Sequence, residues 1–107
     1  MSNSETLLKA ILSMTARQAL PVNVVSEIVL KGGGGTKQLH AFNMCDGNMS
    51  QGEVAKAAKI DSGNFSKTVN RWIDSGILFR LGEGRESRLL HVYPLPTNVG
   101  KKARTPK

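Results

Sequence analysis

A short turn between two helical segments, residues 50–58 and 62–75, constrains the fold of this chain more than any other feature of its sequence. Ser50 and Glu53 have the spacing of a capping box, which predicts that the first helix begins there. The small alanine side chains of this segment let a second helix approach closely, and Ile60 lies in the connection, where it can fill the corner between the two helices. The pattern predicts a tightly packed helix pair.

The second helix of this pair carries the clearest amphipathic pattern in the chain. Asp61 or Ser62 can cap its beginning, and Gly76 has the position of a glycine that ends a helix. Its apolar side chains recur at the i, i+4, i+7 and i+8 spacing that puts them on one face; they are Phe65, Val69, Trp72 and Ile73. Two short helices, a short turn and an alanine-lined contact together predict a helix-turn-helix.

The period of the apolar residues changes after this helix. Residues 77–81 and 88–93 are strand-like in composition and flank a glycine-bearing segment, residues 82–87. This arrangement predicts a β-hairpin. Pro94 and Pro96 end its second strand.

The N-terminal part is predicted to be helical. A first helix covers about residues 4–19, and a second covers about residues 22–30, where the β-branched content makes a strand a real alternative. Four glycines then form a hinge. A third helix, capped by Thr36, runs to about Cys45, and Asp46-Gly47 is predicted to make the turn that follows it.

The first helix has a wider apolar face than a lone helix can expose to water, so it must pack on the following domain or on a second copy of the chain. Four residues form this face: Leu7, Leu8, Ile11 and Leu12. We expect a homodimer.

The charge of the chain is strongly positive and unevenly distributed. Fifteen Lys and Arg residues against eight Asp and Glu give a net charge of +7. Residues 51–107 carry most of this excess, as expected for a protein that binds a polyanion. Residues 97–107 are predicted to form a disordered basic tail. No apolar run is long enough to span a bilayer and the start does not read as a secretory signal, so we expect a cytoplasmic, nucleoid-associated protein.

Residues 50–56, 60–73 and 75–78 together resemble the winged helix-turn-helix of bacterial and archaeal regulators, and the MarR-like group is the nearest family. The similarity covers about residues 36–93. It implies a mainly α fold with a small β-hairpin, divided into N-terminal helices with a glycine-rich linker (1–35), a winged domain (36–96) and the tail (97–107). Members of such families commonly have a glycine at the end of the first helix of the motif, where this chain has Lys59.

Recognition helices read base edges in the major groove from their outward face. Asn64, Lys67 and Arg71 are spaced to form one such stripe opposite the apolar face, so Asn64 can pair with adenine and the two cations with guanine. The beginning of the helix adds small residues that allow close approach: Ser62, Gly63 and Ser66. In the hairpin, the candidate contacts to the DNA backbone or minor groove are Arg80, Arg85 and Arg88, although Glu83 and Glu86 could instead pair with them.

These features favour sequence-specific binding of double-stranded DNA by a transcriptional regulator. Two alternatives have the same sequence pattern. One is a replication or plasmid-maintenance protein that binds DNA, and the other is a protein–protein adaptor with nonspecific affinity for nucleic acid. No cofactor, metal or catalytic group is expected: His40 and Cys45 do not share a helix face, and Thr36-Lys37 does not complete a P-loop. Cys45 is either a buried small hydrophobe, which we favour, or a redox sensor.

Overall fold

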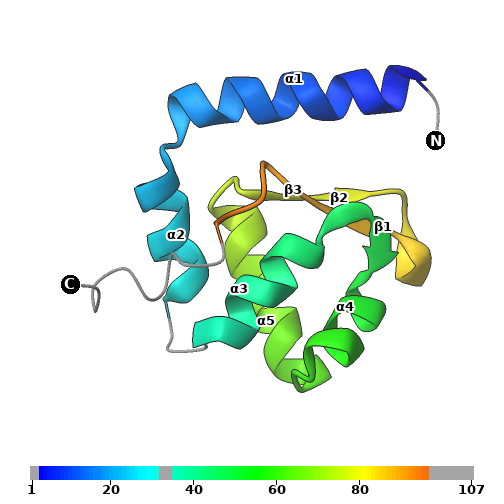
Figure 1. The fold of residues 1–107 in the computed structure, drawn as a ribbon. Helices are drawn as coiled ribbons and strands as arrows, with labels where there is room; N and C mark the ends of the chain where they lie inside the picture. The colour runs from blue at the N-terminus through cyan, green and yellow to red at the C-terminus, as the bar shows by residue number, and fades with distance from the viewer. Residues whose placement is uncertain (1–2, 32–34, 97–107) are drawn as a thin grey trace.

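The computed structural model describes residues 3–31 and 35–96. Within them the chain is mainly helical, with a small three-stranded antiparallel sheet, so the predicted α-rich fold is confirmed at this level (Figure 1). The elements follow in the order α1 (Asn3–Ala19), α2 (Val22–Leu30), α3 (Gly35–Met44), β1 (Asp46–Ser50), α4 (Gln51–Ala58), α5 (Ser62–Asp74), β2 (Leu78–Leu81), a 3₁₀ turn (Gly84–Glu86) and β3 (Arg88–His91).

The helix boundaries agree closely with those predicted. The segment 22–30, for which a strand was the alternative, is helix α2, and its buried residues Val25 and Val29 are spaced by one helical turn. One detail was wrong: Thr36 does not cap α3, because the helix already includes Gly35 and places Thr36 inside its first turn.

The sheet contains the predicted hairpin and one strand that the sequence did not reveal. β3 lies between β1 and β2, and β2 pairs with β3 in register from Leu78 opposite His91. The Asp46-Gly47 pair, predicted as a turn, is instead the beginning of β1. This strand is polar and has no alternating pattern; it is extended because it pairs with β3, and the His91 N–H also donates to the Cys45 carbonyl at 2.7 Å.

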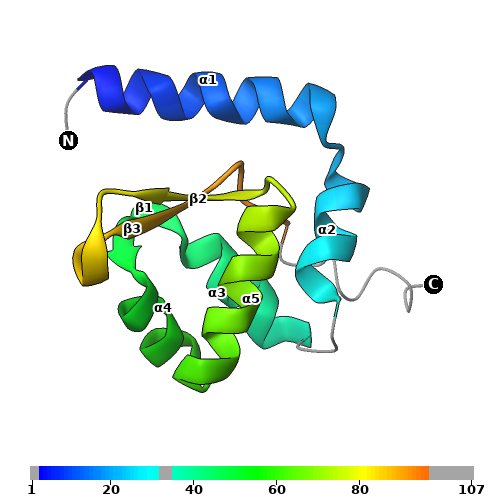
Figure 2. The ribbon, with the colours of Figure 1, turned by 180° about the vertical axis from the view of Figure 1, so that it is seen from behind.

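The two faces of the sheet have different neighbours. Helices α3, α4 and α5 lie on one side, whereas α1 runs across the other side (Figures 1 and 2). On β3, Leu89 is fully buried and Leu90 is only half-buried, as the alternation of a strand requires. The main core therefore lies between the sheet and the three helices.

Trp72 lies at the centre of this core. Its ring makes edge-to-face contacts with Phe42 on α3, at 5.3 Å between centroids, and with Phe65 on its own helix, at 6.1 Å. Val25 and Val29 belong to the same buried cluster, so α2 shares the core of the helices that follow it.

The segment after β3 is held against the N-terminal half of the protein. The Asn43 side chain donates to the Leu95 carbonyl at 2.9 Å and accepts from the Leu95 N–H at 2.8 Å, while the Tyr93 hydroxyl donates to the Leu20 carbonyl. The tail predicted to be disordered, 97–107, lies outside the described residues. No helix within the described ranges is long and apolar enough to cross a bilayer.

Candidate nucleic-acid interface

The beginning of α4 has the capping box that its sequence predicts. The Ser50 hydroxyl accepts from the Glu53 N–H at 3.3 Å, and the Glu53 carboxylate accepts from the Ser50 N–H at 2.9 Å. Two backbone donors that have no partner within the helix are satisfied in this way. The start of α4 is therefore encoded by two neighbouring side chains.

The corner between α4 and α5 is built on a lysine in a left-handed conformation. Lys59 has φ 61°, its N–H donates to the Lys56 carbonyl at 3.2 Å, and the Ile60 N–H donates to the Ala55 carbonyl at 2.9 Å. These bonds form a Schellman motif, in which glycine is the usual left-handed residue. Lys59 thus occupies the backbone position where related motifs have glycine, without the conformational freedom of glycine.

Both ends of α5 are defined as predicted. The Asp61 carboxylate accepts from the Asn64 N–H at 3.0 Å, so this negative charge is directed at the helix amides. At the other end, Gly76 has φ 82°, its N–H donates to the Ile73 carbonyl at 3.0 Å, and the Ile77 N–H donates to the Trp72 carbonyl at 3.2 Å. The Schellman motif confirms Gly76 as the terminating glycine.

The exposed face of α5 is rotated slightly from the face predicted. The fully buried side is formed by Phe65, Thr68, Val69 and Trp72, while Ile73 is only half-buried. Since successive residues are separated by about 100°, the centre of the exposed side consists of Gly63, Lys67, Asn70 and Asp74. The sequence interpretation missed Asn70, and the burial of Thr68, a polar residue, is what shifts the face toward it.

The predicted stripe of Asn64, Lys67 and Arg71 is only partly present. Asn64 and Lys67 are exposed, as are Ser62 and Gly63, whereas Ser66 is half-buried.

Arg71 is the exception within that stripe, and its prediction as an outward base contact needs correction. Its Nη2 donates to the Lys31 carbonyl at 3.0 Å and lies 3.4 Å from the Ile28 carbonyl. These carbonyls are at the end of α2, where the helix itself provides no donors for them. Arg71 therefore joins α5 to α2 instead of projecting freely.

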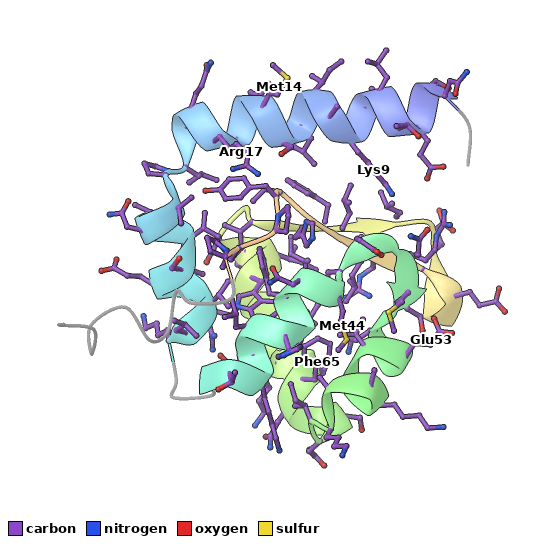
Figure 3. All side chains as sticks on the ribbon, viewed as in Figure 1. Lys9, Met14, Arg17, Met44, Glu53 and Phe65 are labelled. Carbon is purple, nitrogen blue, oxygen red and sulfur yellow. The ribbon has the colours of Figure 1, made fainter. Side chains whose placement is uncertain are left out.

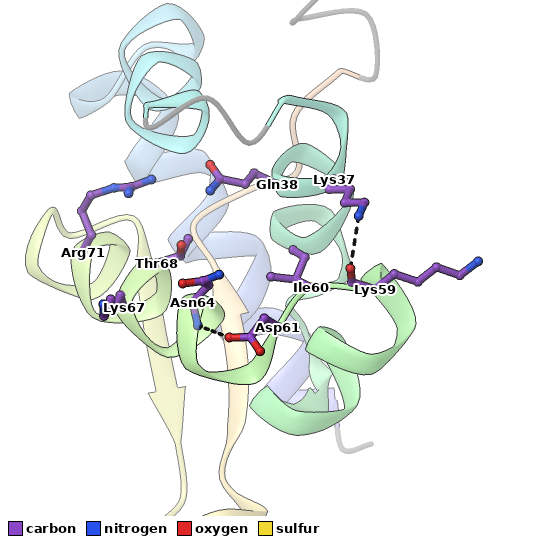
Figure 4. A pocket seen from close by; sticks show the side chains of 9 residues that line it. All are labelled: Lys37, Gln38, Lys59, Ile60, Asp61, Asn64, Lys67, Thr68 and Arg71. Carbon is purple, nitrogen blue, oxygen red and sulfur yellow. Dashed lines mark hydrogen bonds between the residues drawn. The ribbon is translucent and has the colours of Figure 1, made fainter.

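A polar groove of about 460 Å³ lies between α5 and the beginning of α3 (Figure 4). Asn64 and Thr68 form one wall, and Gln38 and Ile60 face them. Four basic residues border it against the single carboxylate of Asp61: Lys37, Lys59, Lys67 and Arg71. The groove is thus a polar, mainly cationic surface beside the exposed face of α5.

Two of these basic residues, Lys37 and Lys59, were not predicted. Lys37 Nζ donates to the Lys59 carbonyl at 3.3 Å, which brings α3 to the corner between α4 and α5. No local sequence signal indicates this contact, because it joins positions far apart in the chain. Within the described residues, Gln38 Oε1 and Arg71 Nε are buried in this region without a hydrogen-bond partner.

The hairpin arginines do not form one group. Arg80 donates to Gln51 Oε1 at 3.2 Å and lies 3.4 Å from Ser87 Oγ, so it links the hairpin to the start of α4. Arg88 lies 4.0 Å from the Glu5 carboxylate on α1, on the other side of the sheet. The side chain of Arg85 is outside the described part of the structure. The structure thus gives Arg80 and Arg88 partners other than Glu83 and Glu86.

Cys45 and His91 are two titratable side chains that lie buried near the sheet. Burial, reinforced by the Asp46 charge, raises the pKa of the Cys45 thiol to about 12, and its Sγ donates to the Ala41 carbonyl at 3.2 Å. Burial also lowers the pKa of His91 from its ordinary value. A thiol in this state is not a nucleophile near neutral pH, which favours the buried-hydrophobe interpretation of Cys45.

No protein-family model, curated protein or solved structure matches this chain. What the surface offers chemically is hydrogen-bond donors and acceptors on the exposed face of α5, with basic groups at its border. Groups of this kind are suited to a negatively charged polymer that also presents hydrogen-bond donors and acceptors.

Proposed function

We propose that the protein binds double-stranded DNA in a sequence-specific manner, as a non-catalytic transcriptional regulator with a winged helix-turn-helix. In this proposal α4 and α5 are the helix-turn-helix, α5 is the recognition helix, and the β2–β3 hairpin is the wing. The chain order of α3, β1, α4, α5, β2 and β3, with β3 central in the sheet, supports this assignment.

The observation that carries the proposal is the exposed side of α5. From Gly63 to Asn70 it presents Lys67 and two amide side chains, Asn64 and Asn70, and no acidic residue. Lysine is suited to guanine and asparagine to adenine in the major groove, which is wide enough for one helix. Gly63 has no side chain, so the surface of α5 can approach DNA closely at this position.

The surroundings of α5 supply groups for contacts that do not depend on sequence. Lys37 and Lys59 border the groove on one side of the helix, and Arg85 belongs to the hairpin turn. Basic groups at such positions neutralise backbone phosphates and make the affinity dependent on salt. In this arrangement α5 determines the sequence specificity, and the basic groups around it determine the orientation of the protein on the duplex.

The test is selection of bound fragments from random duplex DNA, followed by titrations on the selected site and on a scrambled duplex. Lys67→Ala and Asn64→Ala should each weaken binding to the selected site by about 1–3 kcal/mol and leave the scrambled duplex nearly unaffected. Arg85→Ala is the control: it should weaken both complexes by a similar factor and lower the salt slope by about one. None of the three should change the melting temperature by much.

Two results would contradict this assignment. If the wild-type protein binds all duplexes equally, the protein is an adaptor or a nonspecific binder. If Lys67→Ala and Asn64→Ala remain folded and retain the full site preference, α5 is not the recognition helix.

A further inference from the structure

The orientation of α1 is the reverse of that in an ordinary surface helix. Its charged side chains point toward the rest of the protein: Lys9 Nζ donates to the Asp46 carbonyl at 2.8 Å, and the Arg17 guanidinium lies over the Tyr93 ring at 4.6 Å. Gly47 makes the first contact possible, because a Cβ there would lie 2.9 Å from Lys9 Nζ. Figure 3 shows Lys9 and Arg17 directed at the domain, and Met14 directed away from it.

The opposite side of α1 is apolar and exposed. The side chains concerned, with their exposed fractions, are Leu7 (61%), Leu8 (66%), Ile11 (50%) and Met14 (68%). Of the apolar face predicted from the sequence, Leu12 is half-buried, whereas the other three residues do not pack on their own domain. Four large apolar side chains side by side on one helix mark a surface that another molecule covers.

We propose that the exposed face of α1 binds the same face of a second copy of this chain, as an antiparallel helix pair with its two-fold axis at Ile11. Leu7, Ile11 and Met14 have the alternating spacing of three and four residues that forms the seam between two packed helices.

The face is complementary to itself in this orientation. A two-fold axis at Ile11 places Leu8 against Met14 of the partner subunit, and it places Leu7 against the partner's Thr15. Each position on one copy thus meets an apolar or uncharged side chain on the other, as an isologous interface requires. The charged residues Lys9 and Arg17 are turned to the domain, so no like charges meet across the seam.

Other occupants fit this face less well. A helix that lies on a membrane directs its basic residues toward the lipid headgroups, whereas the basic residues of α1 contact Asp46 and Tyr93. Apart from Pro106, the C-terminal residues 97–107 contain only one apolar side chain larger than alanine, Val99, and so cannot cover four large ones.

The size of the face sets the expected strength of the dimer. A helix of 17 residues is about 25 Å long, and a contact of that length and one helix in width belongs with interfaces below about 1,200 Å². We therefore expect association that depends on protein concentration. If the protein binds DNA as proposed above, this axis also relates two α5 helices, and the preferred site is a palindrome.

The experiment is sedimentation equilibrium of the full chain without DNA, so that its outcome is independent of the DNA-binding proposal. The wild type should shift with concentration from the 11.6 kDa monomer toward twice this mass. Leu8→Asp and Met14→Lys should each raise the dissociation constant at least about tenfold, since each places one unpaired charge from each copy in the apolar seam. Both positions are exposed in the single chain, so the fold, checked by circular dichroism, should persist.

The double variant Leu8→Asp/Met14→Lys distinguishes the orientation of the helices. In the antiparallel pair Asp at position 8 meets Lys at position 14 of the other copy, so dimerisation should return, whereas a parallel pair brings like charges together and should stay monomeric. Ala57→Asp adds a charge to an exposed position of α4 and is the matched control; it should dimerise like the wild type.

The proposal is overturned if the wild type remains monomeric at all concentrations, or if the double variant does not recover. It is also overturned if the monomer binds vesicles of phosphatidylcholine and phosphatidylserine and Leu8→Asp abolishes that binding, because a membrane would then be the occupant.

Discussion

Lys59 and Gly76 occupy the same backbone position at the ends of two successive helices, and this makes the energetics of the α4–α5 corner directly testable. Both are left-handed, with φ 61° and 82°, and both donate within a Schellman motif. For an L-residue this conformation costs about 1–2 kcal/mol, and glycine avoids that cost. Part of the gain is lost because glycine also has more freedom in the unfolded chain.

Lys59→Gly should therefore increase the free energy of unfolding by about 1 kcal/mol. For a domain of this size the corresponding rise in melting temperature is about 4–8 °C. Gly76→Ala should have the opposite effect, with a loss of about 1–2 kcal/mol. A Cβ at Gly76 meets no atom within 4 Å, so the loss comes from the backbone alone.

The assay is urea denaturation followed by tryptophan fluorescence, since Trp72 is buried in the core between the helices. Lys59→Ala separates the two contributions of the substitution: it removes the same side chain but keeps the left-handed cost, so it should change stability by less than about 0.5 kcal/mol. The Lys37 contact is to the Lys59 carbonyl and is retained in both variants. If Lys59→Ala stabilises as much as Lys59→Gly, the effect belongs to the side chain and the backbone reasoning is refuted.

Two further predictions concern the core. Trp72→Ala should lower stability by about 3–5 kcal/mol, whereas Trp72→Phe, which keeps a ring between Phe42 and Phe65, should cost less than half as much. Both variants lack the only tryptophan of the chain, so their urea titrations are followed by far-UV circular dichroism. Cys45 should react with a disulfide reagent at pH 8 only as fast as the protein opens. Because its pKa is raised from 9.0 to about 12 in the folded state, the unfolded thiol loses its proton first. Stability should thus decrease as pH rises above 9, by up to about 4 kcal/mol at pH 12, and Cys45→Ala should remove this part of the decrease.

The features that the sequence predicted correctly are those encoded by near neighbours. The capping box joins residues three apart, and the amphipathic face of α5 is visible within four turns of helix. Each of these patterns predicts the structure correctly because the residues that interact are close to each other in the chain. The hairpin was predictable for the same reason.

The features that it missed depend on partners far away in the chain. β1 has no strand pattern of its own and is extended because β3, about 40 residues later, pairs with it. Arg71 has the spacing of an outward residue, yet the carbonyls at the end of α2 bind it. The sequence also did not predict which side of α1 faces the domain, since Lys9 and Arg17 contact distant groups in the sheet and in the segment after it.

These long-range contacts also determine how the proposed dimer face and the proposed recognition helix are placed relative to each other. Three glycines, residues 32–34, separate α2 from α3 in the sequence and, taken alone, would predict that the N-terminal helices move independently of α5. Arg71 instead joins α5 directly to the last turn of α2, and the Tyr93 hydroxyl binds the Leu20 carbonyl between α1 and α2. Both contacts bypass the glycines. A dimer formed through α1 would consequently hold its two α5 helices at a distance set by packed helices and hydrogen bonds, and the spacing of two half-sites in DNA would follow from that distance.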